Sequence, residues 1–536
     1  MSGRDRSTTA LPRRGERGGA LGVLLGWVMT LLLLALALEG ILRLSGLRPV
    51  VTINEPDPEL GWAKRKDEST RKVTGEFDVT FTINSLGLRD DADLTREKPA
   101  GAQRVLVVGD SFVLGYTVER HDHFVDLVER ALVADGRNVQ VLNGGTEGYA
   151  TDQEVAWLRR EGFSFAPDVV VACFFQNDVW MNGQKSYSGT PKPRFALDGS
   201  LEPAPALAAP RRGWLATRTA LFGLVDTLQT SMRYGKELGF QDGSIAMPMD
   251  EVVMLRTPPA GVADAWARTA AAFRALKQSC DEKDAKLLLV AIPTREEVEP
   301  GALERWCKER GVAPDAVDPQ SPAQKALALA AAAGIATLDP KPALAAAAKE
   351  GAKVYFEKDW HLNPAGSRVL GRQLYDALAS PGLLGGAPTA KGDAAFDFVP
   401  EKPLPRWPFV IGALWLLLST LYARTNRDEP ALAAFLQVGV MIAVVVAIVL
   451  GFGELIGLLG PRIGRYVGIA LLVGFGGFLL FKMGPKLSII GEVYGAFLRR
   501  GLWYMIPLLV VMLSIGGLLV VASSSPFIAP FIYTLF

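Results

Sequence analysis

Short and long apolar runs alternate along the middle of the chain, between residues 104 and 380. The short runs are rich in β-branched residues and have the length of buried strands, and the longer stretches have the apolar spacing of helices. The expected strands are residues 104–108, 139–142, 168–174, 287–292 and 336–338. The expected helices are residues 124–134, 152–162, 265–283, 323–333 and 364–379. This order predicts a parallel sheet with helices on both faces, in which functional side chains directly follow strands.

Much longer uncharged runs lie toward the two ends of the chain. The first covers residues 19–38, and about 20 apolar residues are what a helix needs to cross the hydrocarbon layer. The others cover residues 407–423, 431–459, 466–481 and 502–522. These runs predict one N-terminal and about four C-terminal transmembrane helices. Glu454 is the one charged residue within the C-terminal runs, which disfavours a transporter.

Charge beside the first apolar run predicts the orientation of the chain. Five arginines precede it, namely Arg4, Arg6, Arg13, Arg14 and Arg17. Positive charge favours the cytoplasmic side, so the residues after the run are expected to face the periplasm or the exterior. A signal peptide would export the same region, which leaves the cleavage of residues 1–37 open. The predicted location is the cell membrane, with several spans and an external central region.

These runs divide the chain into a central domain flanked by membrane segments. The predicted boundaries are a basic cytoplasmic N-terminus at 1–18, a transmembrane anchor at 19–42, a leader packed on the central domain at 44–103, the central α/β domain at 104–380 with an insertion at 180–260, a linker at 381–406, three transmembrane helices at 407–482 and a C-terminal transmembrane module at 483–536. The central region is long enough to bury one sizeable core with additions around it.

Composition narrows the classes of function. The formal net charge is only +1 and no basic stripe is interleaved with aromatic residues, so nucleic acid is not an expected partner. The chain has three cysteines without a Cys-x-x-Cys spacing and three histidines, a poor set of ligands for a metal site. We expect no metal and no cofactor. Cys173 is expected in the core, and the sequence leaves open whether Cys280 and Cys307 pair.

Three side chains of the central region fit nucleophilic catalysis. Ser111 directly follows the first expected strand, in Gly-Asp-Ser-Phe. A serine hydroxyl needs a base, a group that orients the base and donors for the oxyanion that forms on attack. His121 and His123 lie in a polar loop and are expected to face solvent. His361 is the expected base, because Asp359 precedes it by two residues and a proline-initiated helix follows.

The Gly-Asp-Ser block, the Asn-Asp pair after the third strand and the late Asp-x-His block together resemble the SGNH hydrolase family. The resemblance implies a flavodoxin-like three-layer α/β/α domain. The residues that match are Ser111, Asp359 and His361 for the catalytic triad, Gly148 and Asn177 for the oxyanion hole together with the Ser111 N–H, and Asp110 and Asp178 beside them. Residues 84–89 also resemble a leader segment of bacterial members.

Two positions depart from the pattern of this family. Phe175 replaces the glycine of the Gly-x-Asn-Asp block, which narrows the acyl pocket or moves the Asn177 amide. Only Trp360 separates Asp359 from His361, where the family usually has two residues. Exopolysaccharide acetyltransferases of the alginate type are similar in using Asp-x-His. The resemblance therefore accommodates this spacing.

The C-terminus has a resemblance of its own. Residues 487–492 and 530–536 are similar to a small, uncharacterised family of bacterial membrane proteins. The similarity suggests a fusion of two proteins and a membrane-protein partner in envelope biosynthesis.

The predicted function is that of a membrane-anchored extracytoplasmic serine esterase, which acts on acyl esters, foremost O-acetyl esters, of an envelope glycan or lipid. An O-acetyltransferase of exopolysaccharide or cell-wall glycan would use the same triad, and a catalytically inactive scaffold in an envelope assembly is the third alternative. The sequence leaves open the choice between hydrolase and transferase, the acyl donor and acceptor, the role of the C-terminal helices and the oligomeric state.

Overall fold

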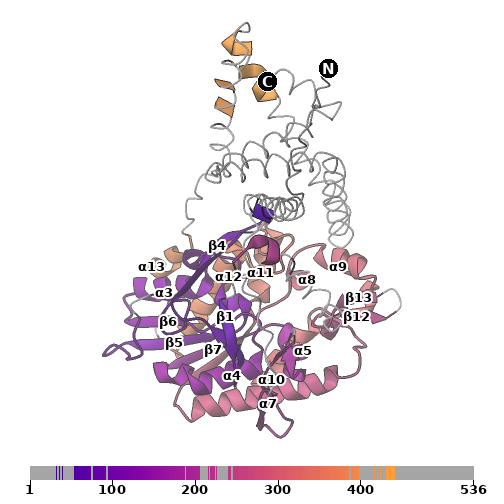
Figure 1. The fold of residues 1–536 in the computed structure, drawn as a ribbon. Coiled ribbons are helices and arrows are strands. Elements are labelled where there is room, and N and C mark those ends of the chain that lie inside the picture. The colour runs from indigo at the N-terminus through magenta and orange to yellow at the C-terminus, as the bar shows by residue number, and fades with distance from the viewer. Residues whose placement is uncertain are drawn as a thin grey trace, which may run out of the picture. The chain divides into compact units, whose positions relative to one another are not determined.

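The chain divides into two units, one formed by Glu39–Pro400 and the other by Met1–Leu38 with Glu401–Phe536. The computed structural model describes residues 53–397, apart from residues 74–75, 92–93, 188, 243–244, 386–387 and most of 206–238, and a few residues between 32 and 39 and between 412 and 440. The α/β domain lies in the unit Glu39–Pro400 (Figure 1). The finer domain boundaries given above stay predictions.

A five-stranded sheet forms the centre of the domain. Its strands are β5 (Gln103–Val108), β6 (Val139–Asn143), β7 (Val169–Phe174), β14 (Lys286–Ala291) and β15 (Ala336–Leu338). The strand order is β15-β14-β7-β5-β6, and every neighbouring pair is parallel. This is the flavodoxin-like order, and each strand begins and ends within one residue of the predicted range. The predicted parallel sheet is confirmed.

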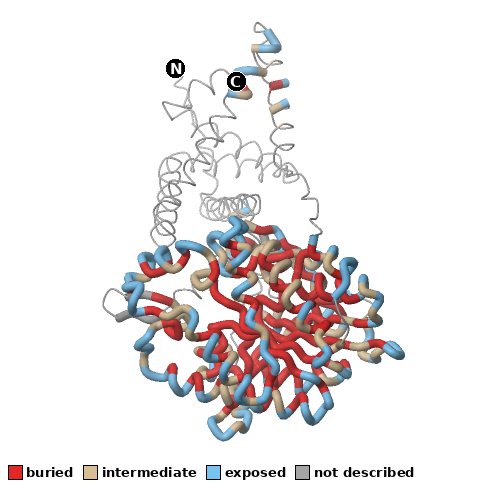
Figure 2. The backbone as a smooth tube through the Cα atoms, turned by 180° about the vertical axis from the view of Figure 1, so that it is seen from behind, coloured by how far each residue is buried: buried red, intermediate tan, exposed pale blue. Residues whose placement is uncertain are grey.

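Helices cover both faces of this sheet, because successive residues of each strand point to opposite sides. In β5, Leu106 and Val108 pack into one core and Val105 and Val107 into the other. The first core includes α4 (Thr151–Arg160), α7 (Val262–Asp281) and α10 (Ser321–Ala332). The second includes α3 (Phe124–Ala134), α11 (Lys341–Lys349) and α12 (Pro364–Leu378). Figure 2 shows the strands as a buried band through the domain, and each fully buried aliphatic side chain contributes roughly 1.5–3 kcal/mol.

Short hairpins and helices surround this three-layer core. The leader before β5 forms two antiparallel hairpins, β1 (Asn54–Asp57) with β2 (Gly61–Lys64) and β3 (Glu68–Val73) with β4 (Asp78–Ile83). Helix α5 (Asn177–Gly183) follows β7, and the insertion then adds β8 (Ser186–Tyr187), β9 (Thr190–Pro191), β10 (Arg194–Phe195), β11 (Leu201–Glu202), β12 (Gly239–Asp242) and β13 (Ile245–Pro248). The remaining helices are α2 (Ser111–Leu114), α8 (Arg295–Val298), α9 (Ala302–Arg310) and α13 (Ala390–Asp393).

The start of α12 is fixed by its cap, which also fixes the loop before it. The Asn363 side chain accepts hydrogen bonds from the N–H groups of Ala365 and Gly366, at 2.9 and 3.0 Å, and such caps stabilise a helix by about 1 kcal/mol. A Cβ atom on Gly366 would lie 2.1 Å from the Val354 carbonyl oxygen, so only glycine fits there. His361 therefore precedes a rigid helix start.

The predicted fold class is wrong in one part, the one N-terminal and about four C-terminal transmembrane helices. Among the residues that the structure describes, no helix is both long enough and apolar enough to cross a membrane. The helices predicted in 19–42, 407–482 and 483–536 fall largely outside the described residues. The fold class is corrected to a parallel-sheet α/β domain.

All three cysteines are buried free thiols. Cys173 lies in β7 and faces the core on the side of α3, as expected. Cys280 lies in α7 and Cys307 in α9, and the structure leaves them unpaired.

Candidate active site

The nucleophile position lies in the tight turn between β5 and α2. β5 ends at Val108 and α2 begins at Ser111, and the Asp110 side chain caps the helix by accepting from the Phe112 N–H at 2.8 Å. β5 lies between β6 and β7, where the chain reverses its direction of winding. Open parallel sheets bind ligands at such a switch point, beyond the carboxyl ends of the strands. Ser111 therefore lies where the fold favours a site.

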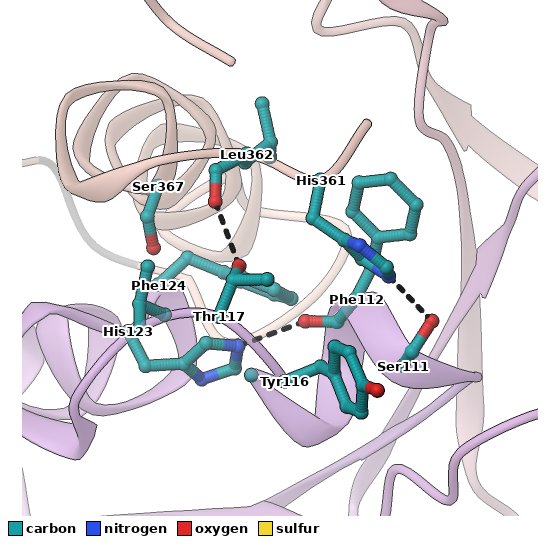
Figure 3. A pocket seen from close by; sticks show the side chains of 11 residues that line it. Ser111, Phe112, Tyr116, Thr117, His123, Phe124, His361, Leu362 and Ser367 are labelled. Carbon is teal, nitrogen blue, oxygen red and sulfur yellow. Dashed lines mark hydrogen bonds between the residues drawn. The ribbon is translucent and has the colours of Figure 1, made fainter. Parts of the chain in front are cut away.

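The structure brings the three predicted triad residues together (Figure 3 shows the serine–histidine bond). Ser111 Oγ and His361 Nε2 are 2.7 Å apart, and His361 Nδ1 and Asp359 Oδ1 are 2.6 Å apart. A carboxylate oxygen can only accept, so Nδ1 carries the proton and Nε2 accepts from the serine hydroxyl. Asp359 Oδ1 also accepts from the backbone N–H of His361 at 3.0 Å. The Asp-x-His spacing thus suits a carboxylate that binds both N–H groups of the histidine.

Asp359 is an ionised partner for this histidine. Burial alone would raise the pKa of Asp359, but the hydrogen bonds and the charge of His361 outweigh burial and hold the pKa below 3.8. A carboxylate in this position fixes the tautomer of the imidazole and stabilises the imidazolium that forms when the serine proton is transferred.

Aromatic rings enclose the histidine. The Trp360 and His361 rings stack with centroids 4.1 Å apart, and the Phe112 and Tyr116 rings lie 4.7 and 5.3 Å from the imidazole. Phe175, the residue in place of the family glycine, stacks on Trp360 at 5.3 Å and packs on Phe112 at 4.6 Å. The substitution therefore completes an aromatic wall, which limits the access of water to the base.

Asn177 lies on the other side of the serine, at the start of α5. Its Nδ2 donates to Asp110 Oδ2 at 3.1 Å, so the capping aspartate holds the amide close to the nucleophile turn. One N–H of this amide stays available for an oxyanion, because an amide nitrogen carries two. A Cβ atom added to Gly148 would lie 3.3 Å from the ring of Tyr187 and 3.5 Å from the ring of Trp62. The role of the Gly148 N–H in an oxyanion hole stays a prediction.

The loop after β6 is nevertheless held directly against the nucleophile helix. The Thr146 N–H donates to the Gly109 carbonyl at 3.0 Å. A Cβ atom on Gly145 would lie 2.3 Å from the Leu114 nitrogen, so the two backbones touch there and no side chain fits. The leader supports the loop from outside, because Lys64 Nζ donates to the Gly145 carbonyl at 2.6 Å. Burial lowers the pKa of Lys64 to about 7.

Carboxyl groups are buried behind Asn177. Asp178, the predicted neighbour of the site, accepts from Thr151 Oγ1 at 3.2 Å, and Glu154 lies on the same helix as Thr151. Burial and then their mutual charge raise the pKa values of Asp178 and Glu154 well above their usual range. Burial also raises the pKa of Asp110. Burial and the nearby carboxyl groups therefore favour the neutral forms of Asp178 and Glu154.

The expectation for one of the other histidines is wrong. His121 is exposed as predicted, but His123 is buried and its Nε2 donates to the Phe112 carbonyl at 2.9 Å. Burial, together with the charge of Arg89, lowers the pKa of His123 to about 3 and keeps the ring neutral. The polar residues around His123 in the sequence suggested a solvent-exposed side chain. Its ring is instead buried and forms a hydrogen bond to the nucleophile helix.

Sequence reasoning also missed Lys64 and Glu154, because neither lies in a motif. The resemblance of residues 84–89 to a leader was the one signal that the segment before β5 packs on the domain.

A small hollow opens beside the triad, with an empty volume of about 230 Å³. Its lining includes Ser111, His361 and Tyr116 (Figure 3).

The fold and this geometry are those of an enzyme that acts on esters, as a hydrolase or an O-acyltransferase, and they resemble the SGNH type. Residues 254–395 match the family model described as SGNH hydrolase-like domain, acetyltransferase AlgX, a range that includes Asp359 and His361. Residues 487–536 match a family of unknown function, DUF5989. The predicted resemblances of the central domain and of the C-terminus are confirmed. No curated protein sequence matches the chain.

Solved structures with a similar course of the chain include several ester hydrolases. The acetyl xylan esterase AlAXEase is 15% identical over 51% of this chain and 99% of its own, with a TM-score of 0.30. A lipase/acylhydrolase from Enterococcus faecalis is 16% identical over 52% of this chain and 95% of its own, with a TM-score of 0.28. An acetylxylan esterase from Geobacillus stearothermophilus is 13% identical over 52% of this chain and 96% of its own, with a TM-score of 0.29.

Proposed function

We propose that the enzyme removes short acyl groups, foremost O-acetyl groups, from a glycan or lipid of the cell envelope, on the periplasmic or outer side of the cell membrane. The observation that carries the proposal is the continuous hydrogen-bonded series from Ser111 through His361 to Asp359. The arginine-rich N-terminus before an uncharged run supports export of the domain.

The reaction follows from the positions of the protons. Ser111 Oγ attacks the ester carbonyl while its proton passes to His361 Nε2, and Asp359 stabilises the imidazolium. Collapse of the tetrahedral intermediate breaks the bond to the alcohol, which takes the proton from His361 and leaves an acyl-serine. Water then attacks this acyl group and gives a proton to His361, and collapse of the second tetrahedral intermediate returns that proton to Ser111 Oγ and releases the carboxylic acid.

The oxyanion would be stabilised on the side of Asn177. Its amide is held by Asp110 at 3.1 Å, which leaves a second N–H for the developing charge. We propose that the N–H groups of Ser111 and Gly148 complete this oxyanion hole.

The dimensions of the site support a short acyl group. The hollow beside Ser111 and His361 is lined by the side chains of Phe112, Tyr116 and Leu362, which leave room for a small group only. The stack of Phe112, Phe175 and Trp360 fills the space that a glycine in the third block would leave. An acetyl group fits these limits better than a long acyl chain.

An O-acetyltransferase is the second candidate, favoured by the description of the family model that covers Asp359 and His361. The same acyl-serine would then react with a sugar hydroxyl in place of water, and His361 would take the proton of that hydroxyl. Acyl donors from the cytoplasm would require a membrane-protein partner to pass them across.

The experiment uses the purified full chain. The protein is incubated with an O-acetylated oligosaccharide, with and without an unacetylated acceptor, and free acetate and acetylated acceptor are both quantified. Release of free acetate without acetylated acceptor identifies an esterase, and formation of acetylated acceptor identifies a transferase. Absence of both products, together with no covalent labelling of Ser111 by a fluorophosphonate in folded protein, contradicts the proposal.

A further inference from the structure

One carboxylate of the leader holds the loop that carries the triad aspartate. Glu76 lies between β3 and β4, more than 280 positions before this loop. Its Oε1 accepts from the N–H groups of Glu357 and Lys358 at 2.7 and 2.9 Å. Its Oε2 accepts from those of Lys358 and Asp359 at 3.1 and 2.8 Å. Three successive backbone N–H groups thus converge on a single side chain.

This loop needs such a partner because regular structure does not supply one. Residues 357–360 form the tip of a hairpin whose flanking segments pair through the bridge between Tyr355 and Leu362 and a hydrogen bond of 3.1 Å from the Phe356 N–H to the His361 carbonyl. Glu357, Lys358 and Trp360 are exposed, and Asp359 is half-buried. That pairing ends at Phe356 and His361, so the N–H groups within the tip need another acceptor. A carboxylate that binds three N–H groups makes charge-assisted hydrogen bonds, which are stronger than neutral ones.

The hairpin that carries Glu76 is itself attached to the domain. Val79, Phe81 and Ile83 of β4 are buried in one cluster with Leu114 of α2, the helix that begins at Ser111. The Phe77 ring lies 5.4 Å from the ring of Phe356, next to the loop. The hairpin therefore contacts both the nucleophile helix and the segment that carries the acid.

A cation of the same hairpin faces the site. Lys72 Nζ lies 3.1 Å from the centroid of the Tyr116 ring, which packs against His361. The charge of Lys72 also favours the ionised form of Asp359 and so helps to lower its pKa. The β3–β4 hairpin thus contributes both hydrogen-bond geometry and charge at this aspartate.

We infer that Glu76 is a positioning residue of the active site, which acts through Asp359 and extends the site to one side chain of the leader hairpin. The inference rests on the proposed function of Ser111, His361 and Asp359. Glu76 binds the backbone of the loop and fixes the direction in which Asp359 presents its carboxylate to His361. The family match at residues 254–395 does not include this hairpin.

The test compares Glu76→Ala, Glu76→Gln and Arg71→Ala in the full chain, with a chromogenic acetate ester as substrate. Glu76→Ala removes all four hydrogen bonds, and we expect kcat to fall about tenfold to a hundredfold with KM nearly unchanged, because a misplaced catalytic group slows the chemical step. Glu76→Gln keeps one accepting oxygen and should recover part of the loss. Arg71→Ala removes the exposed ion pair with Asp78 on the same hairpin and should leave kcat within about twofold of the wild type.

A second comparison separates positioning from general support of the fold. In an Asp359→Asn background, Glu76→Ala should lower kcat by no more than about twofold further, since residues that act through one group are not additive. Full additivity of the two substitutions, or wild-type kcat in both Glu76 variants, would overturn the inference. Failure of the proposed function looks different, because the wild-type protein itself would then neither hydrolyse nor transfer acyl groups.

Discussion

The triad and the buried group formed by Asn177, Asp178 and Glu154 differ in how completely their polar atoms are paired. On the base side, both ring nitrogens of His361 are hydrogen-bonded, and Asp359 Oδ1 accepts twice. On the other side, one oxygen each of Asn177, Asp178 and Glu154 is buried without a hydrogen-bond partner among the residues that the structure describes. Buried polar atoms are nearly always paired in folded proteins, so this concentration beside a nucleophile is unusual.

The difference indicates two kinds of preparation for the reaction. The base side is fully arranged before a substrate arrives, which lowers the reorganisation needed when the proton moves. On the side of Asn177, the buried carboxyl groups Asp178 and Glu154 have raised pKa values, and the amide donates to Asp110. Substitutions on the base side should therefore change the rate, whereas those on the other side should separate into effects on the rate and effects on stability.

The largest effect is expected when the group shared by both sides is removed. Ser111→Ala should lower kcat/KM for an acetate ester by about 10⁴-fold to 10⁶-fold, because neither the base nor the oxyanion donors have a nucleophile to assist. Ester hydrolysis followed by absorbance measures this loss, and circular dichroism checks the fold. A rate of hydrolysis within tenfold of the wild-type rate would show that Ser111 is not the nucleophile.

On the base side, Asp359→Asn should be nearly as severe. We expect a fall in kcat of about 10³-fold to 10⁴-fold, because an amide offers its N–H to the histidine and stabilises the wrong tautomer. Single-turnover kinetics with the acetate ester measure the acylation step directly. A loss of kcat below tenfold would show that Asp359, at its short Asp-x-His spacing, has only a minor role in catalysis.

On the opposite side, Asn177→Ala tests whether the amide serves the reaction or only the packing. Removal of one oxyanion donor lowers kcat by about 10²-fold to 10³-fold, so we expect a loss of this size in kcat and little change in KM. Thr151→Val is the matched control, because it removes a hydrogen bond to Asp178 from the same buried region without touching the amide. Equal losses in both variants would assign Asn177 to packing.

The smallest effect is expected for Glu154→Gln, and it should depend on pH. Burial and neighbouring charge raise the pKa of Glu154 in the folded state above 4.5. A raised folded-state pKa stabilises the protein fully below the unfolded value and loses this contribution as pH rises toward the folded one. Glutamine resembles the neutral acid, so the free energy of unfolding should differ by less than about 1 kcal/mol at pH 5.

At higher pH the two proteins should diverge. The free energy of unfolding of the wild type should fall more steeply between pH 5 and pH 9 than that of Glu154→Gln, so the variant becomes the more stable of the two. Urea unfolding at pH 5, 7 and 9, followed by circular dichroism, measures the difference. Parallel pH dependence of the two proteins would place an ionised carboxylate at residue 154.

Local patterns predicted the central sheet and the triad well. Continuous β-branched runs such as residues 169–174 are buried on both faces, and a strand of this kind can be recognised without knowledge of its neighbours. Ser111 and His361 carry their chemistry in their side chains, and their blocks follow the order of the family. The predicted transmembrane helices are the part of the fold class that failed.

Other parts of the site depend on contacts between distant segments. Glu76 and Lys64 lie in ordinary polar surroundings along the sequence, and their roles arise only when the hairpins fold back onto loops hundreds or tens of residues away. His123 was misjudged for the same reason, because its burial comes from tertiary packing and not from its polar neighbours. Sequence periodicity reports which face is buried, but not which backbone groups a side chain will bind.

The distance along the chain between nucleophile and base affects when the enzyme first becomes active. Ser111 and His361 are separated by 250 positions, and a ribosome that adds about 5–20 residues per second needs roughly 10–50 seconds to synthesise that stretch. Until then the growing chain carries a serine without its proton acceptor. Nascent protein is therefore inert toward acyl esters, and activity begins only when His361 and the helix that follows it, α12, have packed onto the domain.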